Sequence, residues 1–165
     1  IEKYLKEILS LKAYYNIVVR PHPLMKREDP KSHKKLMNTD LNYIDNSEED
    51  NVQLFALADL MLLDYGGTMF GCLYTNKNFA FLDMGSDAKN NELFGESTSE
   101  NYVKSFFPDR IATSKDIKSI CNYCIENPPN DSVMKSLREE FFNTNYQGKS
   151  AKRAYELLIS DDWIK

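Results

Sequence analysis

Short apolar runs that alternate with helical segments constrain the fold of this chain more than any other feature. Residues 60–63 form a continuous apolar run that ends at Asp64, which is typical of a central parallel strand buried on both faces. Strands that alternate with helices predict βαβ units, and therefore a Rossmann-like α/β fold whose mostly parallel sheet is flanked by helices. The other strands are expected at residues 15–19, 41–44, 78–82 and 110–112. Helices are expected at residues 1–12, 31–37, 52–57, 69–74, 114–126, 131–142 and 149–160, and a long, partly irregular loop at 83–108.

Length and charge limit the classes of protein to consider. The 165 residues suit one domain, and the net charge of -4 argues against nucleic-acid binding, which needs a basic face. There is no secretory signal pattern and no apolar run near the roughly 20 residues of a membrane span. We therefore expect a cytoplasmic lobe, with room for contact at the inner face of a membrane. The chain opens inside a helical pattern at Ile1 without an N-cap, so we expect residues 1–165 to be one lobe of a longer, two-domain chain.

Three cysteines, Cys72, Cys121 and Cys124, fit reduced thiols in the cytoplasm. Cys121 and Cys124 form a CxxC pair, which can carry redox chemistry or half of a metal site. The pair lies inside a helical pattern, with no second Cys or His pair at zinc spacing, so two ordinary helix cysteines are the favoured interpretation.

Asp64-Tyr65-Gly66-Gly67-Thr68 joins the run at 60–63 to the next helix. Glycines at a strand-to-helix turn expose backbone N–H groups, and the helix start adds partial positive charge, so the turn suits a phosphate or pyrophosphate. The alternative is a plain tight turn with Thr68 as the N-cap.

Arg20-Pro21-His22-Pro23 follows another predicted strand, and its two prolines indicate a rigid loop. Histidine held there suits a general base or a donor to a phosphate oxygen, and Arg20 could pair with phosphate. The alternative is a rigid connection with an exposed histidine.

A basic segment at residues 26–35 contains Lys26, Arg27, Lys31, Lys34 and Lys35, together with His33. In an acidic chain this cluster indicates an anion nearby, either a phosphorylated substrate or an anionic membrane surface, unless it is simply a solvated helix face. Gly148-Lys149-Ser150 begins the last predicted helix and offers backbone donors and one lysine, although alone it is only a capping signal. The acidic residues form no clear metal site, so no metal is expected.

Three motifs, taken in order, resemble the carboxyl-terminal half of the CDP-glycerol glycerophosphotransferase family, whose members build or prime teichoic-acid-like polymers. The motifs are Val18-Val19-Arg20-Pro21-His22-Pro23, Ala58-Asp59-Leu60-Met61-Leu62-Leu63-Asp64-Tyr65 and Tyr146-Gln147-Gly148-Lys149-Ser150-Ala151. Their spacing also fits, so the resemblance covers residues 14–160.

The resemblance implies the nucleotide-binding, carboxyl-terminal lobe of a two-lobed GT-B enzyme. It implies a CDP-linked donor, a polymer or lipid-linked acceptor contacted by the other lobe, no cofactor or metal, and no activity for this lobe alone. It places His22 at the donor phosphates or in catalysis. By the same resemblance the donor phosphates contact Arg20, Gly66, Gly67, Thr68, Gly148, Lys149 and Ser150, with support from Asp64 and Tyr65.

One departure keeps other functions open. The family usually has Asp-Tyr-Ser-Ser, whereas this chain has Gly66 and Gly67 in place of the serines. The backbone donors survive this change but two hydroxyls do not. The alternatives are the lobe of a nucleotide-sugar glycosyltransferase or epimerase, and a non-catalytic module that keeps the fold.

Overall fold

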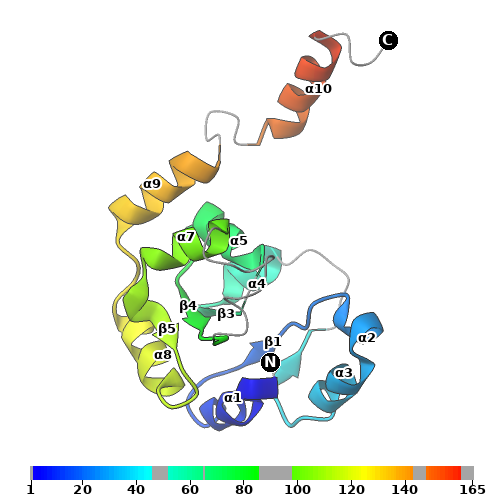
Figure 1. The fold of residues 1–165 in the computed structure, drawn as a ribbon, viewed down its shortest axis with the longest axis vertical. Helices are drawn as coiled ribbons and strands as arrows, with labels where there is room; N and C mark the ends of the chain where they lie inside the picture. Colours follow the sequence, from blue (N-terminus) through cyan, green and yellow to red (C-terminus); the bar gives the residue numbers. More distant parts are fainter. Residues whose placement is uncertain (1, 46–51, 65, 86–97, 143–147, 161–165) are drawn as a thin grey trace.

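The computed structural model describes residues 2–45, 52–64, 66–85, 98–142 and 148–160. Helices and strands alternate along the chain (Figure 1). The strands are β1 (Val18–Val19), β2 (Tyr43–Ile44), β3 (Met61–Leu63), β4 (Phe79–Leu82) and β5 (Ile111–Ala112). The helices are η1 (Glu2–Tyr4), α1 (Leu5–Leu11), α2 (Met25–Glu28), α3 (Pro30–Met37), α4 (Val52–Leu57), α5 (Thr68–Thr75), α7 (Ser99–Ser105), η2 (Pro108–Arg110), α8 (Ile117–Glu126), α9 (Asp131–Phe141) and α10 (Ser150–Ser160).

The strands pair in parallel throughout, which confirms the predicted Rossmann-like α/β class. They form two sheets, one of order β1-β2 and one of order β3-β4-β5. The prediction that residues 60–63 form the central strand is wrong. β4 is central and all four of its residues are buried, whereas Met61 and Leu62 of β3 are only partly buried because β3 pairs with β4 alone among the described strands.

Helices cover both faces of the three-stranded sheet. Phe79 and Phe81 face a core that α4, α5, α7 and α9 supply, and the Phe79 and Phe107 rings meet edge to face at 5.0 Å. Leu82 faces a second core built from η1, α1 and α8. This division follows from the alternation of side chains along a strand. In open α/β folds of this kind, ligands generally bind beyond the carboxyl ends of the strands.

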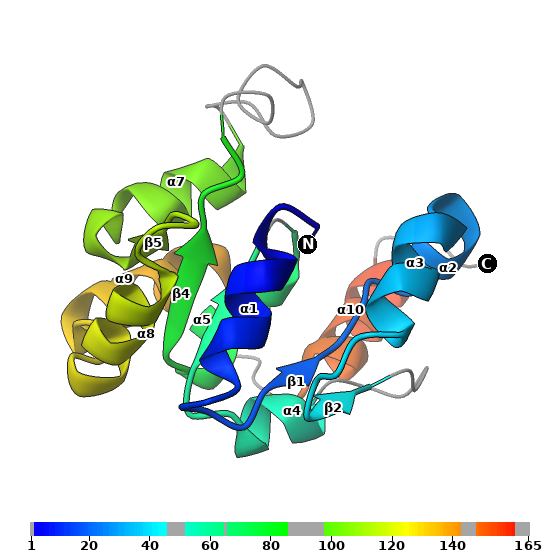
Figure 2. The same ribbon diagram turned by 90° about the horizontal axis from the view of Figure 1, so that it is seen from below.

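Helix α1 connects the two sheets through side chains. Leu5 packs with Val19 of β1 and with Leu36, whereas Ile8 and Leu11 pack in the core that contains Leu82 of β4. Figure 2 shows α1 between β4 and β1. The two sheets are therefore linked by side-chain packing against one helix.

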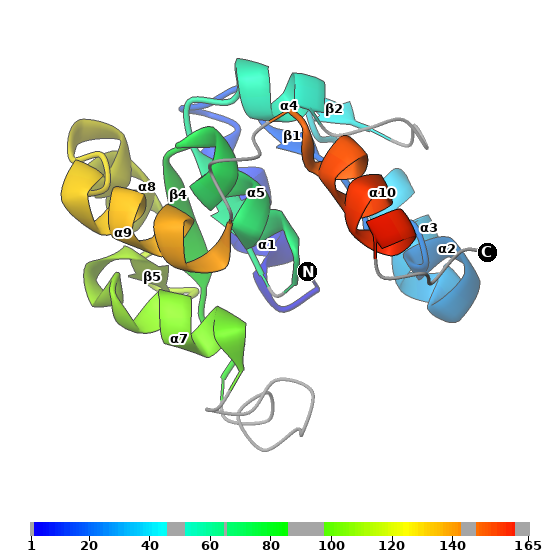
Figure 3. The same ribbon diagram turned by 90° about the horizontal axis from the view of Figure 1, so that it is seen from above.

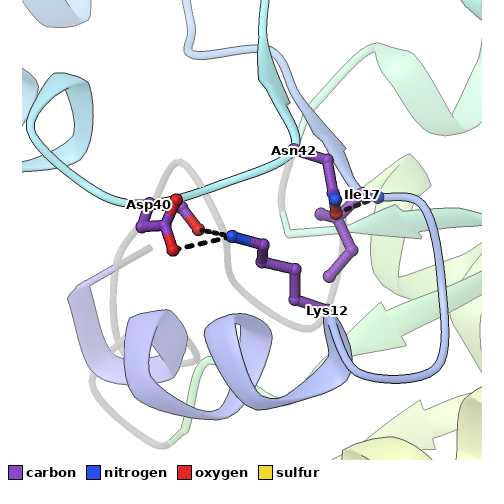
Figure 4. Close-up of polar contacts among 4 residues, drawn as sticks. All are labelled: Lys12, Ile17, Asp40 and Asn42. Atoms are coloured by element: carbon purple, nitrogen blue, oxygen red, sulfur yellow. Dashed lines mark hydrogen bonds and ion pairs between the residues drawn. The ribbon is translucent and has the colours of Figure 1, made fainter.

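Polar contacts secure the end of α1 to the segment before β2 (Figure 4). Lys12 Nζ lies 2.7 Å from the carbonyl oxygen of Asp40 and 2.8 Å from its Oδ2. The Ile17 N–H donates to Asn42 Oδ1 at 3.0 Å. These contacts hold the segment that precedes β1 against the segment that precedes β2.

Helix α7 corrects the prediction of a long loop at residues 83–108, of which residues 86–97 lie outside the described part. Thr98 caps this helix, since its side chain accepts from the Asn101 N–H at 3.4 Å. Val103 is fully buried, and Phe107, just beyond the helix, is almost as buried. The apolar spacing of Val103 and Phe107 and the threonine cap were the available signals for a helix here.

The last two helices, α9 and α10, have nearly the predicted bounds but differ in burial. α9 buries Met134 and Leu137 against the body of the protein. Helix α10 buries no residue and projects away from the body (Figure 1). None of the helices in the described ranges is long and apolar enough to span a bilayer.

The cysteines are free and buried, and Cys121 and Cys124 lie within α8. This confirms the interpretation of the CxxC as two ordinary helix cysteines. Burial raises the pKa of Cys121 to about 11 and that of Cys72 to about 12, so neither thiol is a ready nucleophile at neutral pH.

Candidate functional site

Lys3 and Tyr4 cover the carboxyl ends of strands β4 and β5. The fully buried Tyr4 donates its hydroxyl to the carbonyl of Asp83, and its Oη also lies 3.3 Å from the carbonyl oxygen of Ala112. Lys3 Nζ donates to the same Asp83 carbonyl at 2.9 Å. Burial, and then the charges of Asp83 and Asp116, raise the pKa of Tyr4, so its hydroxyl stays protonated as a donor. The loops after β1 and β3 carry the predicted site residues.

After β3 the chain enters helix α5 through Gly66 and Gly67. Gly66 has a φ of 110°, which favours glycine, and Gly67 is the N-cap of the eight-residue helix α5. Thr68 is the first residue of the helix, so the alternative that Thr68 is the N-cap is wrong. A Cβ at Gly66 or Gly67 would meet no described atom within 4 Å, so a side chain at either position has room among the described residues.

The N–H groups of this turn divide into two sets. Those of Met69 and Phe70 donate to the Gly66 and Gly67 carbonyls at 3.4 and 3.0 Å. Those of Gly67 and Thr68 have no backbone acceptor within the described ranges. Unbonded N–H groups at a helix start, together with the helix dipole, favour an anion.

The loop after β1 holds His22 in a defined orientation. The Leu24 N–H donates to His22 Nδ1 at 3.2 Å, and the Met25 N–H donates to the His22 carbonyl at 2.9 Å. Because Nδ1 accepts a hydrogen bond, the neutral ring carries its proton on Nε2. The exposed imidazole therefore offers an Nε2–H donor, which suits a phosphate oxygen better than the role of a base.

Arg20 pairs with a carboxylate in the structure. Its Nη1 lies 3.2 Å from Oδ2 of Asp45, whose side chain is only 10% exposed, so the ion pair is largely shielded from water. The Asp45 N–H also donates to the Val19 carbonyl at 2.8 Å. Sequence reasoning missed Asp45, although its position directly after a strand was the available signal. Arg20 therefore links the ends of β1 and β2, and its contact with a donor phosphate stays a prediction.

The start of α10 carries the third group of predicted phosphate contacts. Gly148 has a φ of 71°, and Gly148, Lys149 and Ser150 are all exposed. Ser150 is the first residue of α10, a helix that projects from the body (Figure 1). The contact of Gly148, Lys149 and Ser150 with phosphate stays a prediction. Tyr65 lies outside the described residues, and the exposed Asp64 sits directly after β3.

The described ranges contain no group of three or more His, Cys, Asp or Glu side chains that could hold a metal ion. The site instead offers backbone N–H groups at the start of α5 and the His22 imidazole, both suited to an anionic ligand. The parallel α/β fold is consistent with a Rossmann-like nucleotide-binding half, in which ligands bind beyond the carboxyl ends of the strands.

Residues 3–160 match the sequence model of the family described as CDP-glycerol:poly(glycerophosphate) glycerophosphotransferase. The match covers most of the chain, so the chain belongs to this family, whose name is that of a transferase. No curated protein and no solved structure matches the chain significantly. The resemblance inferred from the three sequence motifs is thus confirmed at the level of the family.

Proposed function

We propose that this chain is the donor-binding lobe of an enzyme that transfers a polyol phosphate, such as glycerol phosphate, from a CDP-linked donor to a cell-surface polymer. The observation that carries the proposal is the pair of N–H groups of Gly67 and Thr68 at the start of α5, which have no backbone acceptor within the described residues. Family membership supplies the reaction class, and the turn supplies a place for the donor's pyrophosphate.

The proposed reaction is an in-line displacement at phosphorus. An acceptor hydroxyl oxygen forms a bond to the phosphorus that carries the polyol, the anhydride P–O bond to CMP breaks, and the hydroxyl proton passes to a base. Negative charge grows on the CMP oxygen that leaves. We assign the amides at the start of α5 and the His22 Nε2–H to stabilisation of that charge, and one such donor contributes roughly 10²–10³ in rate.

The finer parts of the proposal concern the rest of the enzyme. We place residues 1–165 as the carboxyl-terminal lobe of a GT-B enzyme, whose other lobe supplies the base and contacts a polymer or lipid-linked acceptor. We place the reaction at the cytoplasmic face of the membrane, where such an acceptor would be extended. Within the site we assign His22 to the donor phosphates and Asp64 and Tyr65 to support of the nucleotide.

Calorimetric titration of the chain with CDP-glycerol, CDP, UDP and UDP-sugars tests the donor. Selective binding of the cytidine ligands is the expected result. Selective binding of the uridine ligands would contradict it and favour a nucleotide-sugar glycosyltransferase or epimerase, an alternative that rests on Gly66 and Gly67 replacing a serine pair. No binding at millimolar ligand, repeated with the second lobe present, would favour a non-catalytic module.

The role of His22 is tested in an assay that contains both lobes. His22→Ala should abolish measurable turnover, whereas His22→Gln, whose amide can still donate to a phosphate oxygen, should keep part of it. Full turnover by His22→Ala would exclude His22 from the reaction.

A further inference from the structure

Five basic side chains form one surface on α2 and α3, the α2–α3 cationic face: Lys26, Arg27, Lys31, Lys34 and Lys35. All five are exposed. On α3, Leu36 is 1% exposed and packs with Leu5 and Val19, so helical spacing turns the lysines toward solvent. The five cations stand against two carboxylates, Glu28 and Asp29, in a chain whose net charge is -4.

The two carboxylates of this segment are engaged locally. Glu28 Oε1 lies 3.1 Å from Arg27 Nη2, and the Asp29 side chain caps α3 by accepting from the Ser32 N–H at 3.1 Å. In the described ranges no salt bridge reaches Lys26, Lys31 or Lys34.

The spacing of these lysines does not stabilise the helix. Lys35 lies four residues beyond Lys31, and Lys34 lies three beyond it. Like charges at these spacings destabilise a helix by about 0.2–0.5 kcal/mol per pair. These lysines repel one another, although Lys26, Arg27, Lys34 and Lys35 lie in the last turns of their helices, where the helix dipole favours cations. An anion bound across the face would relieve this repulsion.

The cationic face is attached directly to the candidate site. Helix α2 begins three residues after His22, and its first N–H, that of Met25, bonds to the His22 carbonyl at 2.9 Å. In Figures 2 and 3, α2 and α3 form one flank of the molecule, away from α8 and α9. An anion spread over this flank would have one end near His22.

We infer that the α2–α3 cationic face binds the phosphodiester chain of the acceptor polymer and guides its end toward His22. The inference rests on the proposed function, since the family name gives the acceptor as poly(glycerophosphate), a polyanion with a charge in every repeat. Lysines one helix turn apart, about 5–6 Å, can meet successive charges of such a chain.

The composition of the face favours a polymer over a bilayer as its partner. Helices α2 and α3 contain no Trp, Tyr or Phe, the residues that anchor proteins at a membrane interface. Leu24, which is 39% exposed, is the large apolar side chain nearest in sequence to α2 that protrudes. Such a face can hold a flexible polyanion by charge alone.

The test compares two triple variants of equal charge change in the full chain. The first is Lys26→Gln/Lys31→Gln/Lys34→Gln, on the cationic face. The control is Lys115→Gln/Lys135→Gln/Lys152→Gln, three exposed lysines of other elements. Fluorescence anisotropy with labelled poly(glycerophosphate) gives Kd over a range of salt, anionic phosphatidylglycerol vesicles serve as the second probe, and CDP binding is measured on every variant.

The first variant should bind the polymer roughly 10- to 100-fold more weakly than the wild type, and its salt slope should fall by up to about 2, given about 0.7 per phosphate contact on a single strand. The control should bind as the wild type does. Equal loss in both variants, no loss in either, or no polymer binding by the wild type would overturn the inference. So would loss of vesicle binding with polymer binding intact, which would identify the face as a membrane contact. CDP binding separates this result from the proposed function, because it depends on the α5 turn and not on these lysines.

Discussion

Gly67→Asp should separate the stability of this lobe from its binding of nucleotide. The residue caps α5 with a φ of -63°, which any residue can adopt, and a Cβ there meets no described atom within 4 Å. Aspartate is among the preferred N-cap residues and suits the positive end of the helix dipole. We therefore expect a change in the free energy of unfolding within about 1 kcal/mol, which is roughly 2–4 °C in Tm for a domain of this size.

The affinity of Gly67→Asp for a CDP-linked ligand should, in contrast, fall strongly. A carboxylate about 4 Å from a donor phosphate is repelled by about 4 kcal/mol at an effective dielectric constant near 20, which corresponds to roughly 10³ in Kd. The uncharged Gly67→Ala variant is the matched control and should keep binding within a few fold. Calorimetry with CDP gives Kd, and thermal unfolding gives Tm. Equal affinity of the two variants for CDP would show that the phosphates do not lie at the start of α5. Unfolding of Gly67→Asp would refute the room inferred for a side chain at this position.

Three further outcomes follow from the core, and denaturant unfolding checks each. Arg110 is 3% exposed and donates to Asn78 Oδ1 at 2.8 Å and to the Phe79 carbonyl at 3.0 Å. Arg110→Met should therefore lower the free energy of unfolding by about 3 kcal/mol, because both acceptors lose their donor. A loss below about 1 kcal/mol would contradict this account. Gly71→Ala normally stabilises a helix, but its Cβ would lie 2.5 Å from Phe55 Cζ, so we expect a net loss of about 1 kcal/mol that Phe55→Leu removes. Burial raises the pKa of Cys121 from 9.0 to about 11, so above pH 9 the thiol ionises more readily in the unfolded chain than in the folded one. The free energy of unfolding should therefore be constant below pH 9 and fall between pH 9 and 11. Cys121→Ala should flatten that decline, and an unchanged pH profile would contradict it.

Most elements could be predicted from sequence because their local signals agree with their tertiary environment. The helix predicted at 52–57 has the observed bounds of α4, and the Pro21 and Pro23 loop follows β1 as expected. The order of strands in the sheet could not be predicted from apolar character. Both 60–63 and 78–82 contain apolar runs, and only long-range pairing decides which of them has a neighbour on each side.

In the candidate site, too, the features with a local sequence signal could be predicted and the long-range contacts could not. Glycines at a strand-to-helix turn predict a helix start, and Gly67 is the N-cap of α5, whereas phosphate binding there stays a prediction. The pairing of Arg20 with Asp45, and the hydroxyl of Tyr4 over the ends of β4 and β5, join residues 25 or more positions apart. No local pattern encodes such contacts, because they depend on how the strand ends come together in space.

The bridge that α1 makes between the two sheets has a mechanical consequence. His22 follows the β1-β2 sheet and Gly67 follows the other one, and within the described residues the two sheets share side-chain packing without a ladder of backbone hydrogen bonds. Packed side chains can move past one another by small shear steps at little cost in free energy. Separating two paired strands would instead break every backbone hydrogen bond between them. A small shear of α1 against either sheet would therefore change the spacing between His22 and the start of α5 without breaking a pair of strands.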